Sequence, residues 1–400
     1  MNSKERHEAR RQRRIKKREA KRAAFAWQYD DFDKVFTYGN LYEAYRLCTC
    51  GVRWKGSIQR NLMFSPVETY KMWKRLMLGK FTHDPFYEFD LYERGHLRHI
   101  RSVTVRERGV QRCLSDHALV PLVTRSFVYD NGASMKDKGY TFAIRRIEAH
   151  LHRHFRKYGN EGYILLFDFK RFFDNVCHKV IFDVVDKSVR DERLNWLTKH
   201  FVSAFGDAGL GLGSQISQVL ALASANRLDH YIKEVCRVGK SARYMDDGYL
   251  IHHDKSFLEK CLEGIKMICN KIGIVMNVKK TCIVKLSHGF TFLKARFFLT
   301  KTGKVVKKIY KRSVVIERRK LKRLRSRVND GLMTPQDVFQ SFQSWRSYAR
   351  TFDAFHTICN MEKLVRDLFP VEQCNFQWFS KTEIKKKRKN LRLRMIAEAA

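Results

Sequence analysis

The feature that most constrains this sequence is a pair of adjacent aspartates inside an apolar stretch. Asp246 and Asp247 lie in "ARYMDDGYLIHH", residues 242–253, between residues that favour β-structure. The alternation on both sides of Asp-Asp-Gly predicts a β-hairpin, with the turn at Asp247-Gly248. Two neighbouring carboxylates repel each other, so the pair indicates either an ordinary turn or a site that binds a cation.

A third carboxylate interrupts an apolar run earlier in the chain. Residues 162–175, "GYILLFDFKRFFDN", form a short and nearly continuous apolar stretch that is typical of a buried strand. Asp168 is its one charge before Lys170. A carboxylate in such a strand is unfavourable unless it is paired or binds a metal. Taken alone, Asp168 fits a salt bridge at a strand end as well as a functional site.

The charge balance bears on the partners of the protein. The chain has 400 residues, with 80 Lys and Arg against 41 Asp and Glu, which gives a net charge of +39. This excess favours nucleic acid as the partner, with an anionic membrane surface as the rival. The sequence shows neither a membrane-spanning run nor a signal peptide. Its ten cysteines lack zinc-ligand spacing, which predicts reduced thiols in the cytoplasm.

Three carboxylates on two predicted strands of a very basic chain favour two-metal chemistry. Two Mg²⁺ ions roughly 3.5–4 Å apart can clamp the attacking and leaving oxygens of a phosphoryl transfer. Mg²⁺ prefers hard oxygen ligands, and Mn²⁺ is a possible substitute. Asp168, Asp246 and Asp247 are therefore candidate ligands for nucleotidyl transfer.

Further motifs make the chain resemble the reverse transcriptases. "YMDD" in a hairpin and "FDFKRFF" (167–173) resemble the two catalytic palm segments of that family. Four more segments occur in the family's order and resemble its fingers strand, the loop under the incoming nucleotide, its lysine segment and its primer grip. They are "LRHIRSVTVRERGVQ" (97–111), "GLGLGSQISQ" (209–218), "NVKKT" (277–281) and "FTFLKARF" (290–297). The resemblance covers residues 85–360.

The resemblance implies an α+β right-hand polymerase fold, with fingers, a palm built on an antiparallel sheet, and an all-α thumb. We expect a basic N-terminal arm that is helical only when bound, then fingers with part of the palm, the palm, a helical thumb and a basic C-terminal tail. The expected boundaries are 1–24, 25–161, 162–310, 311–380 and 381–400.

The resemblance also implies catalytic roles for individual residues. The expected metal ligands are Asp168, Asp246, Asp247 and the backbone carbonyl of Phe169. Lys280 matches the lysine that helps to protonate the leaving pyrophosphate, and Lys279 is the alternative.

A second group of residues is expected to bind the nucleotide. Arg98 is the first candidate to hold the triphosphate, with Arg106 and Arg108 as neighbours, because a guanidinium binds phosphate oxygens bidentately. Phe173 matches the family's steric gate, which excludes a ribose 2′-OH, and Phe172 is adjacent. The expected pocket also includes Leu212, Gly213 and Gln218.

The second motif refines the resemblance. Leu212-Gly213 and Ser217-Gln218 stand where group II intron and retroviral enzymes carry Gln-Gly and Ser-Pro. This pattern resembles the reverse transcriptases of diversity-generating retroelements and related antiphage enzymes, as does "SWRSYARTFDAFH" (344–356) in the thumb. It implies error-prone cDNA synthesis, because Leu212 replaces the glutamine beside the nascent base pair.

The partners implied by this pattern are an RNA template, a DNA or RNA primer, dNTPs, a non-coding or template-repeat RNA and a small accessory protein, without a membrane. An antiphage enzyme that uses a non-coding RNA is the alternative role. A catalytically silent RNA-binding scaffold and an RNA-dependent RNA polymerase also remain open. The intact aspartates disfavour the scaffold, and Phe173 disfavours the RNA polymerase.

Overall fold

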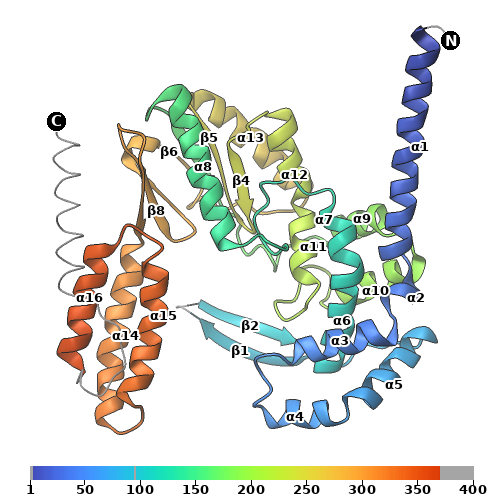
Figure 1. Cartoon of the computed structure of the whole chain (residues 1–400), viewed down its shortest axis with the longest axis horizontal. Helices are drawn as coiled ribbons and strands as arrows, with labels where there is room; N and C mark the ends of the chain where they lie inside the picture. The colour runs from blue at the N-terminus through green and yellow to red at the C-terminus, as the bar shows by residue number, and fades with distance from the viewer. Residues whose placement is uncertain (1–2, 94–95, 370–400) are drawn as a thin grey trace. The chain divides into compact units, whose positions relative to one another are not determined.

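The strands of the chain form three small sheets (Figure 1). A two-stranded ribbon pairs β1 (Tyr87–Glu93) with β2 (His96–Ser102). The second sheet has the order β4 (Ser241–Tyr244), β5 (Asp247–His252), β3 (Tyr163–Phe167) and β6 (Cys282–Lys285). The third contains β7 (Phe290–Phe292), β8 (Ala295–Leu299) and β9 (Val305–Ile309). The structure is a computed structural model that describes residues 3–93 and 96–369, and the chain divides between Val284 and Lys285 into two units.

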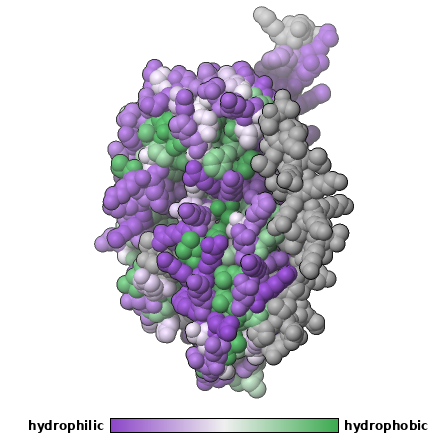
Figure 2. Space-filling model, turned by 90° about the vertical axis from the view of Figure 1, so that its left-hand side faces the viewer, coloured by the Kyte–Doolittle hydropathy of each residue, from purple (hydrophilic) through white to green (hydrophobic). Residues whose placement is uncertain are grey.

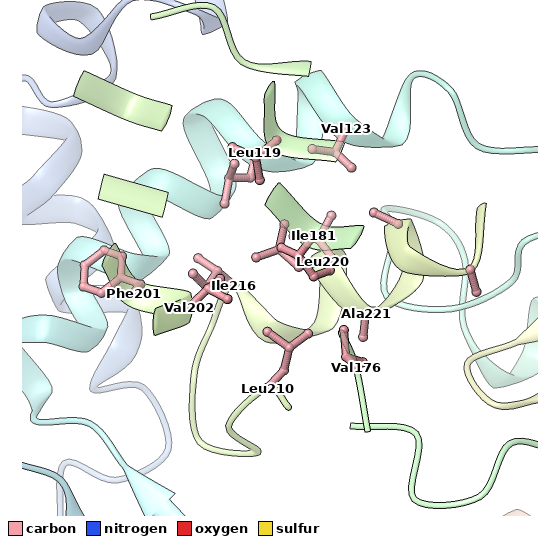
Figure 3. Packing of buried hydrophobic residues seen from close by; sticks show 14 of the residues in the cluster. Leu119, Val123, Val176, Ile181, Phe201, Val202, Leu210, Ile216, Leu220 and Ala221 are labelled. Atoms are coloured by element: carbon pink, nitrogen blue, oxygen red, sulfur yellow. The ribbon is translucent and has the colours of Figure 1, made fainter. Parts of the chain in front are cut away.

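Helices surround the sheets of the first unit. They are α1 (Ser3–Tyr29), α2 (Phe32–Val35), α3 (Tyr38–Cys48), α4 (Gly56–Met63), α5 (Ser65–Met77), α6 (Val105–Leu114), α7 (Val120–Thr124), α8 (Tyr140–Tyr158), α9 (His178–Ser188), α10 (Glu192–Ser203), α11 (Ser217–Ser224), α12 (Asn226–His230) and α13 (Lys255–Lys271). The π-helical turns η1 (Ser115–Leu119) and η2 (Tyr231–Val235) follow α6 and α12. Leu119, Ile181, Phe201 and Leu220 come from four of these segments and pack together in one core (Figure 3).

The apolar character of β3 is explained by its place in the sheet. β3 lies between β5 and β6, and its residues Ile164, Leu165 and Phe167 are almost fully buried. α13 contacts both β3 and β5, which covers the strand with a helix. A strand that is buried on both faces of its sheet has no solvent-facing residues, so its sequence does not alternate. This burial holds the end of β3, just before Asp168, in a fixed position.

The β4–β5 hairpin is present, but its turn lies two residues earlier than predicted. Tyr244 pairs with Asp247, so Met245 and Asp246 form the two-residue turn. Met245 has φ 54°, a left-handed conformation that suits this kind of hairpin turn. Gly248 instead belongs to β5, where a Cβ would lie 2.1 Å from Cζ of Phe167. The glycine is therefore required by packing rather than by the turn.

The N-terminal segment also differs from the prediction. This segment forms the 27-residue helix α1 in the structure of the single chain. The prediction that it is helical only when bound was therefore wrong. Its Arg, Lys, Glu and Ala residues lose little side-chain freedom in a helix, and this favours the helix without tertiary packing. The predicted basic tail, 381–400, lies outside the described residues.

The second unit joins the β7–β9 sheet to three helices, α14 (Lys311–Asn329), α15 (Pro335–Ala349) and α16 (Phe355–Leu368), after the short helix η3 (Leu286–His288). Leu321, Phe342 and Met361 bring the three helices together in one core. The face drawn in Figure 2 is largely hydrophilic, with small hydrophobic patches between. Within the described residues, no helix has the length and apolar character needed to cross a membrane.

The contact between Gly248 and Phe167 yields a stability prediction. We expect Gly248→Ala to lower the free energy of unfolding by about 1–3 kcal/mol, because the added methyl group forces the buried ring to shift. Gly56→Ala is the control, since a Cβ at Gly56 would meet no atom within 4 Å. Chemical denaturation of both variants measures the difference. Equal stability of the two would contradict this account of Gly248.

Candidate active site

The hairpin turn and the end of β3 bring three carboxylates together. Phe167, the last residue of β3, pairs with Gly248 of β5, so Asp168 follows directly beside the turn. The backbone N–H of Phe169 donates to the carbonyl of Asp246 at 3.2 Å, which ties the strand end to the turn. The structure thus brings Asp168 together with Asp246 and Asp247, the nearer of which lies 78 residues further along the sequence.

The three carboxylates affect one another's ionisation. Burial raises the pKa of Asp246, and the nearby Asp168 adds to this effect. Burial, Asp246 and Asp168 together raise the pKa of Asp247 to about 7. Crowded anions of this kind are stabilised by a cation. A set of hard carboxylate oxygens with raised pKa values fits a divalent metal ion.

Asp168 already interacts with two groups of the chain. Its Oδ1 accepts from Nδ2 of Asn277 at 2.8 Å, and its Oδ2 accepts from Nζ of Lys280 at 2.6 Å. Burial lowers the pKa of Lys280, but the Asp168 hydrogen bond and charge outweigh this, and the pKa is raised overall. Lys280 is therefore the lysine of the Lys279-Lys280 pair that neutralises the buried carboxylate.

Within the part of the chain that the structure describes, no three or more His, Cys, Asp or Glu side chains converge as a ready metal-binding cluster. The contacts of Asp168 give a physical reason, because both of its oxygens are engaged by Asn277 and Lys280. A metal ion at Asp168 requires the Lys280 ammonium to move aside. That side chain is 63% exposed, so its movement disturbs little packing.

A buried ion pair positions the turn, and the sequence analysis missed it. Arg243 of β4 donates to both carboxylate oxygens of Asp229, at 2.8 and 2.6 Å. Nη1 of Arg243 also donates to the carbonyl of Met245, in the turn, at 2.8 Å. Both side chains of the pair are at most 3% exposed. An arginine in an alternating strand, two residues before the turn, was the available sequence signal.

The predicted nucleotide loop, residues 209–218, is fixed at both ends and in its middle. Leu210 and Ile216 are buried in the core and bracket the loop (Figure 3). Oε1 of Gln111 accepts from Oγ of Ser214 at 2.8 Å and from the backbone N–H of Gln215 at 3.0 Å. Gln111 lies on α6, and the sequence analysis assigned it no role.

The same loop lies close to the ribbon. A Cβ at Gly213 would lie 2.9 Å from the carbonyl oxygen of Arg101, so this position accepts only a glycine without rearrangement. Leu212 is 41% exposed. Oε1 of Gln218 accepts from Oγ of Ser134 at 3.1 Å. The backbone of the loop and the end of β2 are therefore packed as one piece.

The remaining predicted residues lie as follows. The carbonyl of Phe173 accepts from the N–H of Leu210 at 2.8 Å, which puts this half-buried phenylalanine beside the loop. Phe172 is only 5% exposed and belongs to the core. Arg98 is exposed on β2, opposite Leu91 of β1. Arg106 pairs with Glu68 and Asp84, and Arg108 donates to Ser102.

Comparison with known proteins adds a family match. The family described as "Reverse transcriptase (RNA-dependent DNA polymerase)" matches residues 90–297. A telomerase of Candida albicans, solved with a TWJ fragment of telomeric RNA, is similar over 76% of this chain and 64% of its own, with 12% identity and a TM-score of 0.45. An apo telomerase of Candida tropicalis is similar over 60% of this chain and 53% of its own, with 13% identity and a TM-score of 0.44. The chain thus spans less than two thirds of either telomerase, and no curated protein sequence matches it.

The Arg243–Asp229 pair yields a prediction on stability. Asp229→Asn should lower the free energy of unfolding by about 3–5 kcal/mol, because it leaves the buried guanidinium without its counter-charge. We expect the double variant Arg243→Met/Asp229→Leu to lose less unfolding free energy than the sum of the losses in Arg243→Met and Asp229→Leu. Denaturation of the unaltered protein, the two single variants and the double variant measures this. Simple additivity would show that the two side chains do not act as a pair.

Proposed function

The chain belongs to the reverse transcriptase family, and on that premise we propose that it is an RNA-directed DNA polymerase that copies an RNA template into cDNA. The observation that carries the proposal is the convergence of Asp168 with the turn residues Asp246 and Asp247. All three lie within the matched residues 90–297. We assign the sheet around them to the palm, the β1–β2 ribbon to the fingers and α14–α16 to the thumb.

The carboxylates would serve two divalent ions, with Mg²⁺ as our candidate and Mn²⁺ as a substitute. Asp168, Asp246, Asp247 and the backbone carbonyl of Phe169 would hold them, and the ions would activate the primer hydroxyl and neutralise charge on the transferred phosphate. Lys280 has a raised pKa and stays protonated at neutral pH. The raised pKa keeps a proton on Lys280 but makes it a weaker acid, so we propose that the ammonium donates to the leaving pyrophosphate after it has left Asp168.

Nucleotide selection is assigned to the loop and its neighbours. We propose that Phe173 excludes the ribose 2′-OH, which its half-buried place beside Leu210 supports. Gly213 and Gln218 would shape the floor of the pocket, and Arg98 on the exposed ribbon would bind the triphosphate. A guanidinium on an open strand can reach phosphate oxygens and form two parallel hydrogen bonds with them.

Within this activity we propose error-prone synthesis, as in diversity-generating retroelements. The support is Leu212, a partly exposed apolar residue at the position beside the nascent base pair. Such a side chain cannot hydrogen-bond to the base pair as a glutamine amide can. The partners would be a template-repeat or other non-coding RNA, a primer and a small accessory protein, in the cytoplasm. A faithful enzyme would instead favour the antiphage role.

The carboxylate cluster predicts the result of a primer-extension assay. With an RNA template, a DNA primer, dNTPs and Mg²⁺, we expect Asp246→Asn to retain roughly one thousandth of the rate or less, because it removes several kcal/mol of transition-state stabilisation. Asp207→Asn, which changes an exposed carboxylate, is the control. Extension that survives Asp246→Asn would refute the proposed site. Template binding without incorporation by the unaltered protein would favour a scaffold, and a preference for NTPs would indicate an RNA polymerase.

The loop predicts a change in fidelity. We expect Leu212→Gln to lower the misincorporation frequency several-fold, because the amide can hydrogen-bond where leucine cannot. Sequencing the cDNA made by both proteins on one RNA measures this, and errors of the unaltered protein should concentrate at template adenines. An unchanged error spectrum in Leu212→Gln, or high fidelity in the unaltered protein, would contradict the error-prone assignment.

A further inference from the structure

The basic residues of helix α1 are concentrated on one side, although they are not confined to it. A helix turns by roughly 100° per residue, so residues can be placed around its axis from their numbers. Six of the eleven basic residues of α1 fall within a sector of roughly 100°, and the other five, Lys4, Arg11, Lys16, Arg18 and Arg22, lie outside it. The six are Arg6, Arg10, Arg13, Arg14, Lys17 and Lys21, and we call this sector the basic face. Glu5, Glu8 and Glu19 fall on the opposite side of the helix.

The basic face is open to solvent. All six of its side chains are exposed, and the helix packs on the rest of the first unit through its last turns. There Arg125 lies over the ring of Phe25, and Lys34 lies over the ring of Trp27. Figure 1 shows the N-terminal part of α1 extending past the helices around its C-terminal end. The basic face therefore lies on a part of α1 that projects from the neighbouring helices.

The basic face contains internal repulsion that a binding partner would relieve. Arg6–Arg10, Arg10–Arg14, Arg13–Lys17 and Lys17–Lys21 are all i, i+4 pairs of like charge. Such pairs destabilise a helix by as much as opposite charges stabilise it. A salt bridge between Arg11 and Glu8, at 3.6 Å, lies off this face. A row of anions along the basic face would remove the repulsion.

We propose that the basic face of α1 binds the phosphate backbone of a double-stranded segment of nucleic acid, with duplex RNA adjoining the template as the source. This rests on the proposed function, which supplies an RNA partner. The six cations span about 22 Å along a straight helix axis, at a rise of about 1.5 Å per residue. A nucleic-acid duplex is stiff, as the helix is, and carries closely spaced phosphates along its length.

The opposite side of α1 argues against an anionic membrane surface. A helix that lies in a membrane interface needs an apolar side to bury among the lipids. The side opposite the basic face of α1 instead carries Glu5, Glu8, Gln12 and Glu19. Burying these carboxylates would be unfavourable, whereas contact through phosphates leaves them in water.

Two variants of the full chain test the proposal through the salt dependence of binding. The first, Arg10→Gln/Arg14→Gln/Lys17→Gln, removes three charges. The second, Arg10→Gln/Gln12→Arg/Lys17→Ala/Ala23→Lys, moves two cations to the acidic side and keeps composition and net charge. Binding of a labelled RNA hairpin is measured by fluorescence anisotropy across a salt series. We expect the slope of log K against log [salt] to fall by roughly 2–3 for the first variant and roughly 1.5 for the second.

The outcomes separate this inference from the proposed polymerase activity. A DNA duplex of equal length and a single-stranded RNA, measured in parallel, identify which nucleic acid the helix prefers. A relocation variant with the slope of the unaltered protein would overturn the proposal, because only net charge would then matter. Circular dichroism checks that α1 is still helical in both variants. Primer extension on a short primer–template should be unchanged in both, whereas its absence from the unaltered protein would refute the polymerase and leave the slope test valid.

Discussion

The interaction on which the site of the first unit depends is the repulsion among three carboxylates, of which Asp168 is buried and Asp246 and Asp247 are half-buried. Asp168, Asp246 and Asp247 come close only because β3 and the β4–β5 hairpin are held in register, and burial strengthens the repulsion. Groups of the chain offset part of it, with Asn277 and Lys280 on Asp168 and Arg243 behind the turn.

A second constraint concerns the β1–β2 ribbon and the loop of residues 209–218. Gln111 has one fixed amide orientation, since its Nε2 donates to buried Glu107 and its Oε1 faces the loop. Gly213 packs against the backbone of Arg101, and Arg101 donates to the carbonyl of Phe205. The ribbon and the loop are therefore joined at several points. The groups that we propose to bind the nucleotide would therefore move together rather than independently.

The sequence predicted the elements and failed where tertiary contacts decide. The apolar run before Asp168 and the alternation around Asp246 were sufficient to predict β3 and the hairpin. The turn was misplaced because Gly248 resembles a turn residue, whereas its actual role is to admit the ring of Phe167. Gln111 could not be found because it acts across 103 residues, and Asp229 could not because the pattern does not show which acidic side chain the buried Arg243 meets. The helix of the N-terminal arm was not predicted. The prediction gave more weight to the high charge of this segment than to the helix propensity of its residues.

The contact between Lys280 and Asp168 has a consequence for the protein before it binds an ion or a substrate. Metal-dependent sites rich in carboxylates often need their ion in order to fold, since the anions repel one another without it. Here an ammonium group of the chain itself sits on the most buried carboxylate. Lys280 offsets the charge of Asp168, so this carboxylate is compensated in the folded chain without a metal ion. An ion that bound at the proposed site would have to compete with this tethered ammonium.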